Sequence, residues 1–120
     1  MDKLKYLELV GRIANSVYDF NEYVNAPIAD NLTTEEISAC FVKQMALEME
    51  ELGELAGEVN RDRLYEAMLE AIDVLYIALG TFYFLGNFGE SACNEVIEKN
   101  SKKLSGNYMK SESGKWVKKN

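Results

Sequence analysis

The sequence predicts an all-α domain: a four-helix bundle completed by dimerisation, with a short C-terminal tail or hairpin. Three observations predict this fold class. Apolar residues recur every three or four positions through most of the chain, which is the period of an amphipathic helix. The 120 residues suffice for one domain but not for two of ordinary size. Residues 74–85 are apolar on nearly all sides, so this segment needs more covering helices than one chain supplies.

The first helix is expected over residues 4–24, because its apolar positions lie on one face. Those positions are Leu4, Leu7, Val10, Ile13, Ala14, Val17, Phe20 and Val24. Pro27 follows, and proline cannot continue a helix. Residues 25–32 are therefore expected to form a loop.

A second helix should follow the capping signal at residues 33–36, where two threonines precede two glutamates. A threonine hydroxyl can accept a hydrogen bond from an exposed amide, and early acids suit the helix dipole. The helix is expected to run to about Val59. The chain then breaks at residues 60–62, where Asp62 is predicted to cap the next helix.

The third helix is expected over residues 63–85, with its apolar second half at the centre of the bundle. A turn at residues 86–89 leads to a fourth helix over residues 90–104. In the tail, Ser113 and Gly114 separate two short apolar pairs, which predicts a short hairpin. We expect residues 1–104 to form the all-α domain, with residues 105–120 as a basic tail of the same domain.

The charge of the chain is unevenly distributed. Residues 1–98 carry 6 Lys and Arg against 19 Asp and Glu, whereas residues 99–120 carry 7 Lys and one Glu. An acidic body argues against duplex nucleic acid as a partner, because binding to its phosphates needs a broad basic face. The distribution fits a site in which cations bridge carboxylates to a phosphorylated ligand. The lysines of the tail would then contact the phosphates from the opposite side of the ligand. A solvated acidic surface with a frayed tail is the alternative interpretation.

Composition excludes several kinds of site. Histidine is absent, which removes His-based acid–base catalysis, Ser-His-Asp triads and most zinc sites. Cys40 and Cys93 are far apart in the chain and are expected to be free thiols. The N-terminus lacks the apolar core of a signal peptide, and the 12 apolar residues at 74–85 are too few to cross a bilayer. A cytoplasmic location without membrane contact is therefore expected.

Acidic residues cluster on the second and third helices. Glu51 and Glu54 are three positions apart, Glu50 and Glu54 are four apart, and Glu70 and Asp73 are again three apart. Such spacings place side chains on one helical face, where like charges repel. No Lys or Arg lies within a turn of Glu70 or Asp73, although their neighbours are apolar. Carboxylates in an apolar helix are costly unless a cation pairs with them.

Antiparallel helices joined by a short turn would bring the two acidic pairs face to face. Oxygen ligands without nitrogen or sulfur favour a hard cation, Mg²⁺ or in its place Mn²⁺. We predict Glu51, Glu54, Glu70 and Asp73 as the metal ligands, and Glu50 or Glu51 as the residue that handles the attacking water. Magnesium held by carboxylates usually completes its shell with water and phosphate. The alternative is an exposed acidic face whose Glu70 and Asp73 pair with distant lysines.

These residues resemble a known metal-binding signature. Segment 50–55 reads EELGEL and segment 70–76 reads EAIDVLY. In this order and spacing they resemble the all-alpha nucleoside triphosphate pyrophosphohydrolases, the MazG-like superfamily that also includes phosphoribosyl-ATP pyrophosphohydrolase and the all-alpha dUTPases. Segments 19–23 (DFNEY), 98–104 (EKNSKKL) and 113–118 (SGKWVK) are similar to one branch of that superfamily. This chain departs from the branch at two positions. Asn21 stands where the branch commonly has His, and Gln44 stands where it commonly has Arg; both positions bear on base preference and rate.

The resemblance implies Mg²⁺-dependent hydrolysis of a nucleoside triphosphate between its α- and β-phosphates, which yields the monophosphate and pyrophosphate. It also implies that Asn21 and Asn100 contact the base or sugar, and that Lys103 and Lys115 stabilise charge on the phosphates. The other partner expected is the chain itself, as a homodimer or a tetramer. Two alternatives remain: a non-catalytic helical dimer that senses nucleotides or scaffolds a partner, and an acidic interaction protein with no ligand.

Overall fold

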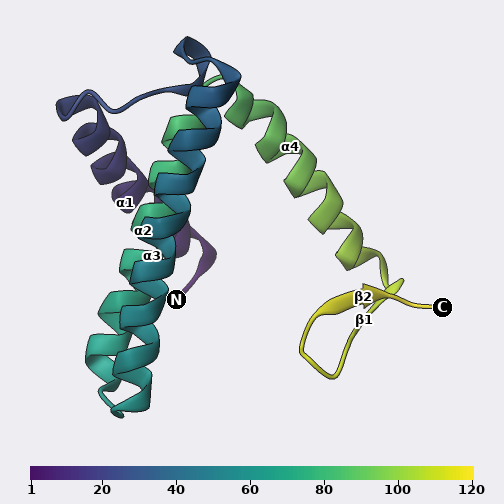
Figure 1. Ribbon diagram of the computed structural model, residues 1–120. Helices are drawn as coiled ribbons and strands as arrows, with labels where there is room; N and C mark the ends of the chain where they lie inside the picture. The colour runs from purple at the N-terminus through teal and green to yellow at the C-terminus, as the bar shows by residue number, and fades with distance from the viewer. The chain divides into compact units, whose positions relative to one another are not determined.

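The first part of the chain, residues 1–86, folds as a unit of three α-helices in the computed structural model, which describes residues 1–120. Helix α1 spans Lys3–Tyr23, α2 spans Thr34–Asn60 and α3 spans Leu64–Leu85 (Figure 1). A single 3-10 turn, Ala29–Asn31, lies in the loop after Pro27. The sequence therefore predicted these three helices to within a few residues at each end.

Local signals set most of these boundaries. The Asp2 carboxylate accepts a hydrogen bond from the Lys5 amide at 2.8 Å and caps α1. At the start of α2, the Glu36 amide donates to the Thr33 hydroxyl at 3.2 Å, and the Thr33 amide donates to the Glu36 carboxylate at 3.0 Å. This reciprocal pair is a capping box. These hydrogen bonds to Thr33 lower the pKa of Glu36.

The turn between α2 and α3 differs from expectation. Asp62 does not cap α3, because its backbone has a φ of 58° and forms the left-handed residue of a tight turn. Arg63 takes the N-cap position without a capping side-chain hydrogen bond. Its guanidinium pairs instead with Glu58 and with Glu66, each at 3.3 Å, and so joins the end of α2 to the start of α3.

Helices α2 and α3 run antiparallel and side by side, and α1 packs against α3 (Figure 1). The rings of Phe41 and Phe84 meet edge to face at 5.3 Å between centroids, and Gln44 donates to Thr81 at 3.1 Å. Later residues of α2 therefore meet earlier residues of α3. On the other side of α3, Tyr83 donates to Glu22 of α1 at 3.1 Å.

The junction after α3 depends on a glycine. Gly86 has a φ of 57°, and a Cβ there would lie 2.6 Å from the Ile28 Cγ2 atom and 2.7 Å from the Asp30 Oδ1 atom. Only glycine fits both the conformation and the space.

The interior of this unit is small. Only Val17, Ala29, Ala67 and Phe84 are buried. The apolar second half of α3 was expected to need more covering helices than one chain supplies, and in the single chain α1 and α2 leave most of it only half-buried. The apolar stretch is also longer than predicted. By length and composition α3 could cross a membrane, with a mean hydropathy of 1.6 over 18 residues, a property that core helices of soluble proteins share.

The second unit comprises residues 87–120. Helix α4 spans Phe88–Ser101, two residues earlier than expected at its start, and a 3-10 turn, Lys102–Ser105, follows it. Strands β1, Tyr108–Lys110, and β2, Trp116–Lys118, pair antiparallel with Met109 opposite Val117. The predicted hairpin is therefore confirmed, as is the all-α character of the rest. The two units meet at Gly86–Asn87.

Candidate functional site

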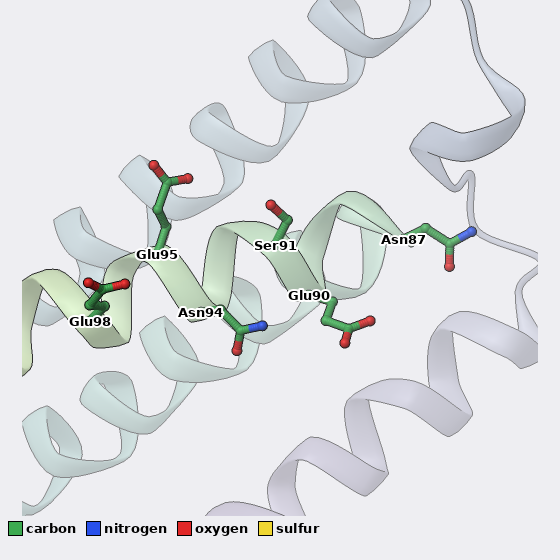
Figure 2. A pocket seen from close by; sticks show the side chains of 6 residues that line it. All are labelled: Asn87, Glu90, Ser91, Asn94, Glu95 and Glu98. Carbon is green, nitrogen blue, oxygen red and sulfur yellow. The ribbon is translucent and has the colours of Figure 1, made fainter.

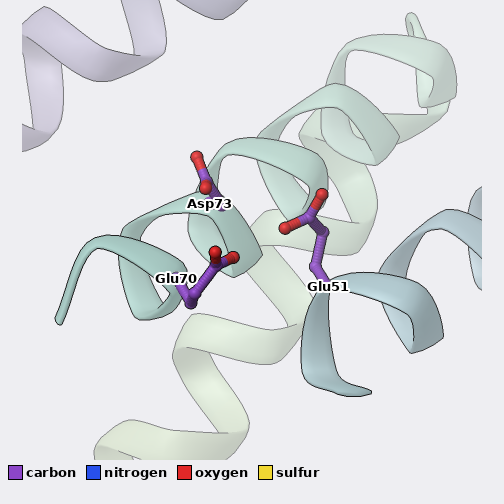
Figure 3. A group of neighbouring side chains, drawn as sticks. All are labelled: Glu51, Glu70 and Asp73. Carbon is purple, nitrogen blue, oxygen red and sulfur yellow. The ribbon is translucent and has the colours of Figure 1, made fainter. Parts of the chain in front are cut away.

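Three carboxylates from two helices converge in the first unit. Glu51 projects from α2, and Glu70 and Asp73 project from adjacent turns of α3 (Figure 3). One oxygen from each lies within 4.8 Å of the others. Glu70 and Asp73 share a face of α3 because they are three residues apart, and the antiparallel packing places Glu51 opposite them. The structure thus brings together three of the four residues predicted as metal ligands. We call them the acid triad.

No Lys or Arg side chain pairs with the acid triad. One oxygen of Glu51 and one of Glu70 are shielded from solvent and accept no hydrogen bond. The structure contains four ion pairs, and none involves Glu51, Glu70 or Asp73. Glu58, by contrast, is offset by Arg61 and Arg63. The alternative in which Glu70 and Asp73 pair with lysines is therefore not what the structure contains.

Exposure differs across the acid triad. Glu51 and Glu70 are half-buried, and Asp73 is exposed. The apolar helix that carries Glu70 and Asp73 is flanked by α1 and α2 alone in the single chain, which leaves Asp73 on its open side. The side of the triad that carries Asp73 is open, so a ligand can reach it from solvent.

The electrostatics of the triad disfavour three ionised carboxylates. Burial raises the pKa of Glu51, and the charges of Glu54 and Asp73 raise it further. Burial also raises the pKa of Glu70, and the charge and hydrogen bonding of Glu54 add to the shift. A divalent cation at this position would reverse these effects, because it stabilises the ionised form.

Glu54 and Glu50 lie beside the triad rather than within it. Both are exposed on α2, and both line a hollow of about 580 Å³ that adjoins Glu70. We call this the acidic hollow; its lining is Glu50, Gly53, Glu54, Gly57, Glu58, Arg61 and Glu70. A Cβ on Gly53 would meet nothing within 4 Å, so this glycine leaves the floor of the hollow open rather than serving the packing. Sequence reasoning missed Gly53, Gly57 and Arg61, although their spacing from Glu50 and Glu54 places them on the same face.

A second hollow, of about 280 Å³, lies where α1, α2 and α3 meet, with Asn21, Gln44, Tyr83 and Phe84 in its lining. We call it the apolar hollow. Gln44 precedes Glu51 by seven residues, so the hollow lies two helical turns, about 10 Å, along the α2–α3 groove from the triad. The Asn21 side-chain amide donates to the Val17 carbonyl at 2.8 Å.

The apolar hollow also contains a cation and a thiol that sequence reasoning missed. Lys43 and Cys40 both contribute to its lining. Their spacing from Glu51 along α2, two and three turns, is the signal that could have identified them.

The other predicted substrate-binding residues belong to the second unit. Lys103 donates from its ammonium to the Asn100 side-chain oxygen, and the Asn100 amide donates to the Val96 carbonyl at 2.8 Å. Lys115 lies in the hairpin turn, where its carbonyl accepts from the Ser111 amide at 2.7 Å. Within their unit, Asn100 and Lys103 are therefore adjacent, and Lys115 is held by the turn.

A further hollow of about 510 Å³ follows α4 and is lined by Asn87, Glu90, Ser91, Asn94, Glu95 and Glu98. All six residues come from α4 and the residue that precedes it, and Figure 2 shows Ser91 and Glu95 on one side of the ribbon and Glu90 and Asn94 on the other. The side chains do not converge, so we assign no chemistry to this hollow.

Comparison with known proteins adds no relative to this description. The resemblance to the pyrophosphohydrolases accordingly rests on the motifs named above, and the candidate site rests on its own geometry. No protein-family model, no curated protein and no solved structure matches the chain.

Proposed function

We propose that the chain is a Mg²⁺-dependent nucleoside triphosphate pyrophosphohydrolase, which cleaves between the α- and β-phosphates to release the monophosphate and pyrophosphate. One observation carries the proposal: Glu51, Glu70 and Asp73 offer oxygens within 4.8 Å of one another, and no side-chain cation pairs with them. The bond cleaved is taken from the resemblance of segments 50–55 and 70–76 to the MazG-like superfamily.

The donor set favours a hard cation. Only carboxylate oxygens are offered, and with Glu54 at the edge of the triad four such groups are within one region. Glu51, Glu54, Glu70 and Asp73 would hold Mg²⁺, with Mn²⁺ as a substitute. When bound, the ion would neutralise phosphate charge and lower the pKa of a coordinated water.

Glu50 and Glu51 are the residues assigned to the attacking water. Glu50 is exposed at the rim of the acidic hollow, where it can orient a water because it does not coordinate the ion itself. Glu51 belongs to the triad, so its carboxylate lies next to the position proposed for the ion and its coordinated water, where it would accept the proton of that water. Single variants of Glu50 and of Glu51 would show which of the two residues activates the water.

The α2–α3 groove supports an extended nucleotide as substrate. The acidic hollow next to the triad would take the phosphates, with Arg61 as the nearest cation. The apolar hollow would take the base, with Asn21 as the polar contact. Asn100, Lys103 and Lys115 are assigned to base, sugar or phosphate from the resemblance, and Lys103→Gln and Lys115→Gln test their contribution.

The decisive experiment is a panel of canonical and oxidised nucleoside triphosphates with Mg²⁺ or Mn²⁺, scored by pyrophosphate release. Glu54→Gln and Asp73→Asn should each abolish release while the far-UV circular dichroism spectrum stays unchanged. Glu35→Gln is the matched control, because Glu35 is an exposed acid on α2 outside the groove. Absence of pyrophosphate across the whole panel with both metals would refute the enzymatic proposal.

The second candidate is a non-catalytic dimer that senses nucleotides or scaffolds a partner. Its support is that Gln44 and Asn21, the two departures from the resembling branch, are engaged by Thr81 and Val17 within the protein. It predicts calorimetric nucleotide binding without turnover. A protein with no ligand would show no shift of its melting temperature with Mg²⁺.

We place the activity in the cytoplasm, where the free thiols of Cys40 and Cys93 would stay reduced. Neither duplex nucleic acid nor a membrane is proposed as a partner. Completion of the bundle by a second copy of the chain is part of the proposal, as a dimer or a tetramer.

A further inference from the structure

The C-terminal hairpin carries aromatic and basic side chains on one face. In the pairing of β1 with β2 (Figure 1), Tyr108 lies opposite Lys118, and Lys110 lies opposite Trp116. Side chains that lie opposite each other in a ladder, and those two residues apart in one strand, project from the same face of a sheet. These four side chains therefore share one face, which we call the hairpin face. Each of its rings is paired across the ladder with a lysine.

The hydrogen-bond pattern of the hairpin brings these side chains close together. The Ser111 amide donates to the Lys115 carbonyl at 2.7 Å, and the Lys119 amide donates to the Asn107 carbonyl at 2.8 Å. Hydrogen-bonded and non-hydrogen-bonded pairs alternate along an antiparallel ladder, so both pairs of the hairpin face are of the non-hydrogen-bonded kind, in which opposite side chains are closest. The turn is fixed as well, because the Lys115 amide donates to the Ser111 hydroxyl at 3.1 Å.

Both rings of the hairpin face are available to a ligand. Trp116 is 49% exposed, and Tyr108 is half-buried. The two ring–ring contacts of the structure lie in the first unit, so neither ring is stacked on another aromatic side chain. The aliphatic neighbours Met109 and Val117 are opposite each other and project from the other face. The hairpin face is therefore aromatic and basic without an aliphatic component.

The positive charge around the hairpin is not neutralised. Residues 99–120 carry seven lysines and one glutamate. None of the ion pairs in the structure involves any of these lysines. The 3-10 turn Lys102–Ser105 contacts β1, so two further lysines, Lys102 and Lys103, lie near the hairpin. A polyanion is the ligand that complements this charge.

We propose that the hairpin face binds single-stranded nucleic acid, RNA or DNA. Bases stack on Tyr108 and Trp116, and the ammonium groups of Lys110 and Lys118 contact the phosphates between and beside them. Every base has a π face, so two rings with flanking cations accept any sequence. With one base on each ring, the face holds about two nucleotides of a longer strand.

Two other polyanions fit the hairpin face less well. A duplex offers no free base to the rings, because its bases are stacked on one another inside the helix. Anionic lipid would be attracted to the lysines, but insertion into a bilayer uses aliphatic side chains together with aromatic ones. Met109 and Val117 lie on the other face, so the rings and the aliphatic side chains cannot enter lipid from one side.

The native chain contains its own reporter, because Trp116 is its only tryptophan. In EDTA and about 50 mM salt, oligothymidylate or oligouridylate of about eight residues should quench Trp116 fluorescence saturably. Thymidine monophosphate, with one base and one phosphate, should bind at least tenfold more weakly. If the monophosphate binds as tightly as the oligomers, the hairpin is a mononucleotide site and the proposal fails. Absence of saturable quenching by both oligomers would also overturn it.

Two neighbouring lysines on opposite faces of the hairpin form a matched pair. Lys118→Gln should weaken oligomer binding at least threefold and reduce the slope of log affinity against log salt by about 0.7, the value of one phosphate contact on a single strand. Lys119→Gln removes the same charge from an equally exposed position whose side chain projects from the other face, so it should change the affinity less than twofold. Equal losses from the two variants would show attraction by net charge alone and would exclude the hairpin face.

The stacking contribution is measured by the anisotropy of a labelled oligomer. Trp116→Ala should weaken binding at least fivefold, whereas Trp116→Phe keeps a ring and should bind within about threefold of the native chain. Val117→Ala, on the other face, should bind as the native chain does. If Trp116→Ala disrupts the hairpin, the matched lysine pair decides the question.

An arm with anionic vesicles separates nucleic acid from lipid. Vesicle binding without oligomer binding would assign the hairpin face to a membrane and overturn the proposal. Every measurement is made in EDTA and none involves turnover. This inference therefore stands or falls separately from the pyrophosphohydrolase.

Discussion

Glu51 on α2 and Glu70 on α3 face each other, and each has a carboxylate oxygen that is shielded from solvent and accepts no hydrogen bond. Together with Asp73 they place oxygens within 4.8 Å of one another. In most proteins such positions in a helix–helix contact are apolar. This arrangement of carboxylates therefore destabilises the folded chain when no cation is bound. The stability of the chain should for that reason respond strongly to metal binding.

Magnesium should stabilise the folded chain, and Glu70→Gln should remove that effect. At 100 times its dissociation constant, a ligand that binds only the folded state adds about 2.7 kcal/mol to the free energy of unfolding. In EDTA, Glu70→Gln should melt at a higher temperature than the native chain, because it removes one of the repelling charges. Thermal melts with EDTA and with Mg²⁺ measure both effects. If the native melting temperature is the same in both, the triad does not bind the ion; Glu35→Gln should behave as the native chain does.

The pH dependence of stability should carry the signature of Glu51 and Glu70. Their pKa values are raised in the folded chain, so the folded state binds protons more readily than the unfolded state. In EDTA, the free energy of unfolding should therefore increase as pH falls from neutrality toward the ordinary glutamate value of 4.5, and decrease as pH rises. Urea titrations at pH 5, 6 and 7 measure this change in the free energy of unfolding. Glu51→Gln should flatten the trend, and saturating Mg²⁺ should abolish it.

Below this range the trend should reverse. The pKa of Glu36 is lowered by its hydrogen bonds to Thr33, so its contribution to stability is lost as pH falls through that depressed value. A steady increase in stability to the lowest pH would contradict the role of the capping box.

Gly86→Ala should destabilise the first unit by about 1–3 kcal/mol through backbone conformation alone. The added methyl would also press on Ile28 and Asp30, so the measured loss should be larger than this. Gly106→Ala is the matched control: it has a φ of 87° and open space around it, and should lose only about 1 kcal/mol. Urea unfolding of both variants separates strain from contact, and equal losses would show that the contacts of Gly86 are unimportant.

Gly53 and Gly11 form a matched pair in helix interiors. A Cβ at either position would meet nothing within 4 Å, so each Gly→Ala change should raise the free energy of unfolding by about 0.5–1 kcal/mol. Larger side chains should separate the two sites. Gly53→Leu fills the acidic hollow and should reduce pyrophosphate release at least tenfold, whereas Gly11→Leu on α1 should not. Equal activities would remove the acidic hollow from the proposed substrate site.

The parts of the fold that sequence could predict are those with local signals. Pro27 and the Thr33–Glu36 capping box set the loop and the start of α2 because each acts within a few residues. The cap expected at Asp62 failed because the turn geometry selected a left-handed residue there, which depends on how α2 and α3 meet. Helix α4 begins at Phe88, two residues before the predicted start. Its N-cap residue makes no capping side-chain hydrogen bond, so the sequence carries no local signal for this boundary.

The residue types of the candidate site and the pairing of its two helices were predictable, but its exact membership was not. Spacing alone placed Glu70 with Asp73, and the antiparallel turn placed Glu51 opposite them. The exclusion of Glu54 from the triad depends on the rotation of α2 against α3, which no local pattern encodes. Lys43 and Gly53 were missed because a lone lysine and a lone glycine carry no signal until a neighbouring helix turns them toward a groove.

A contact between α2 and α3 that contains carboxylates has a consequence for proteolysis. Arg61 and Arg63, both cleavage points for trypsin-like proteases, lie exposed at the end of this contact. A cation bound by Glu51, Glu70 and Asp73, as proposed above, would hold α2 against α3 and so limit a protease's access to that turn. On this proposal, the supply of the cation in a cell would govern how long the chain survives.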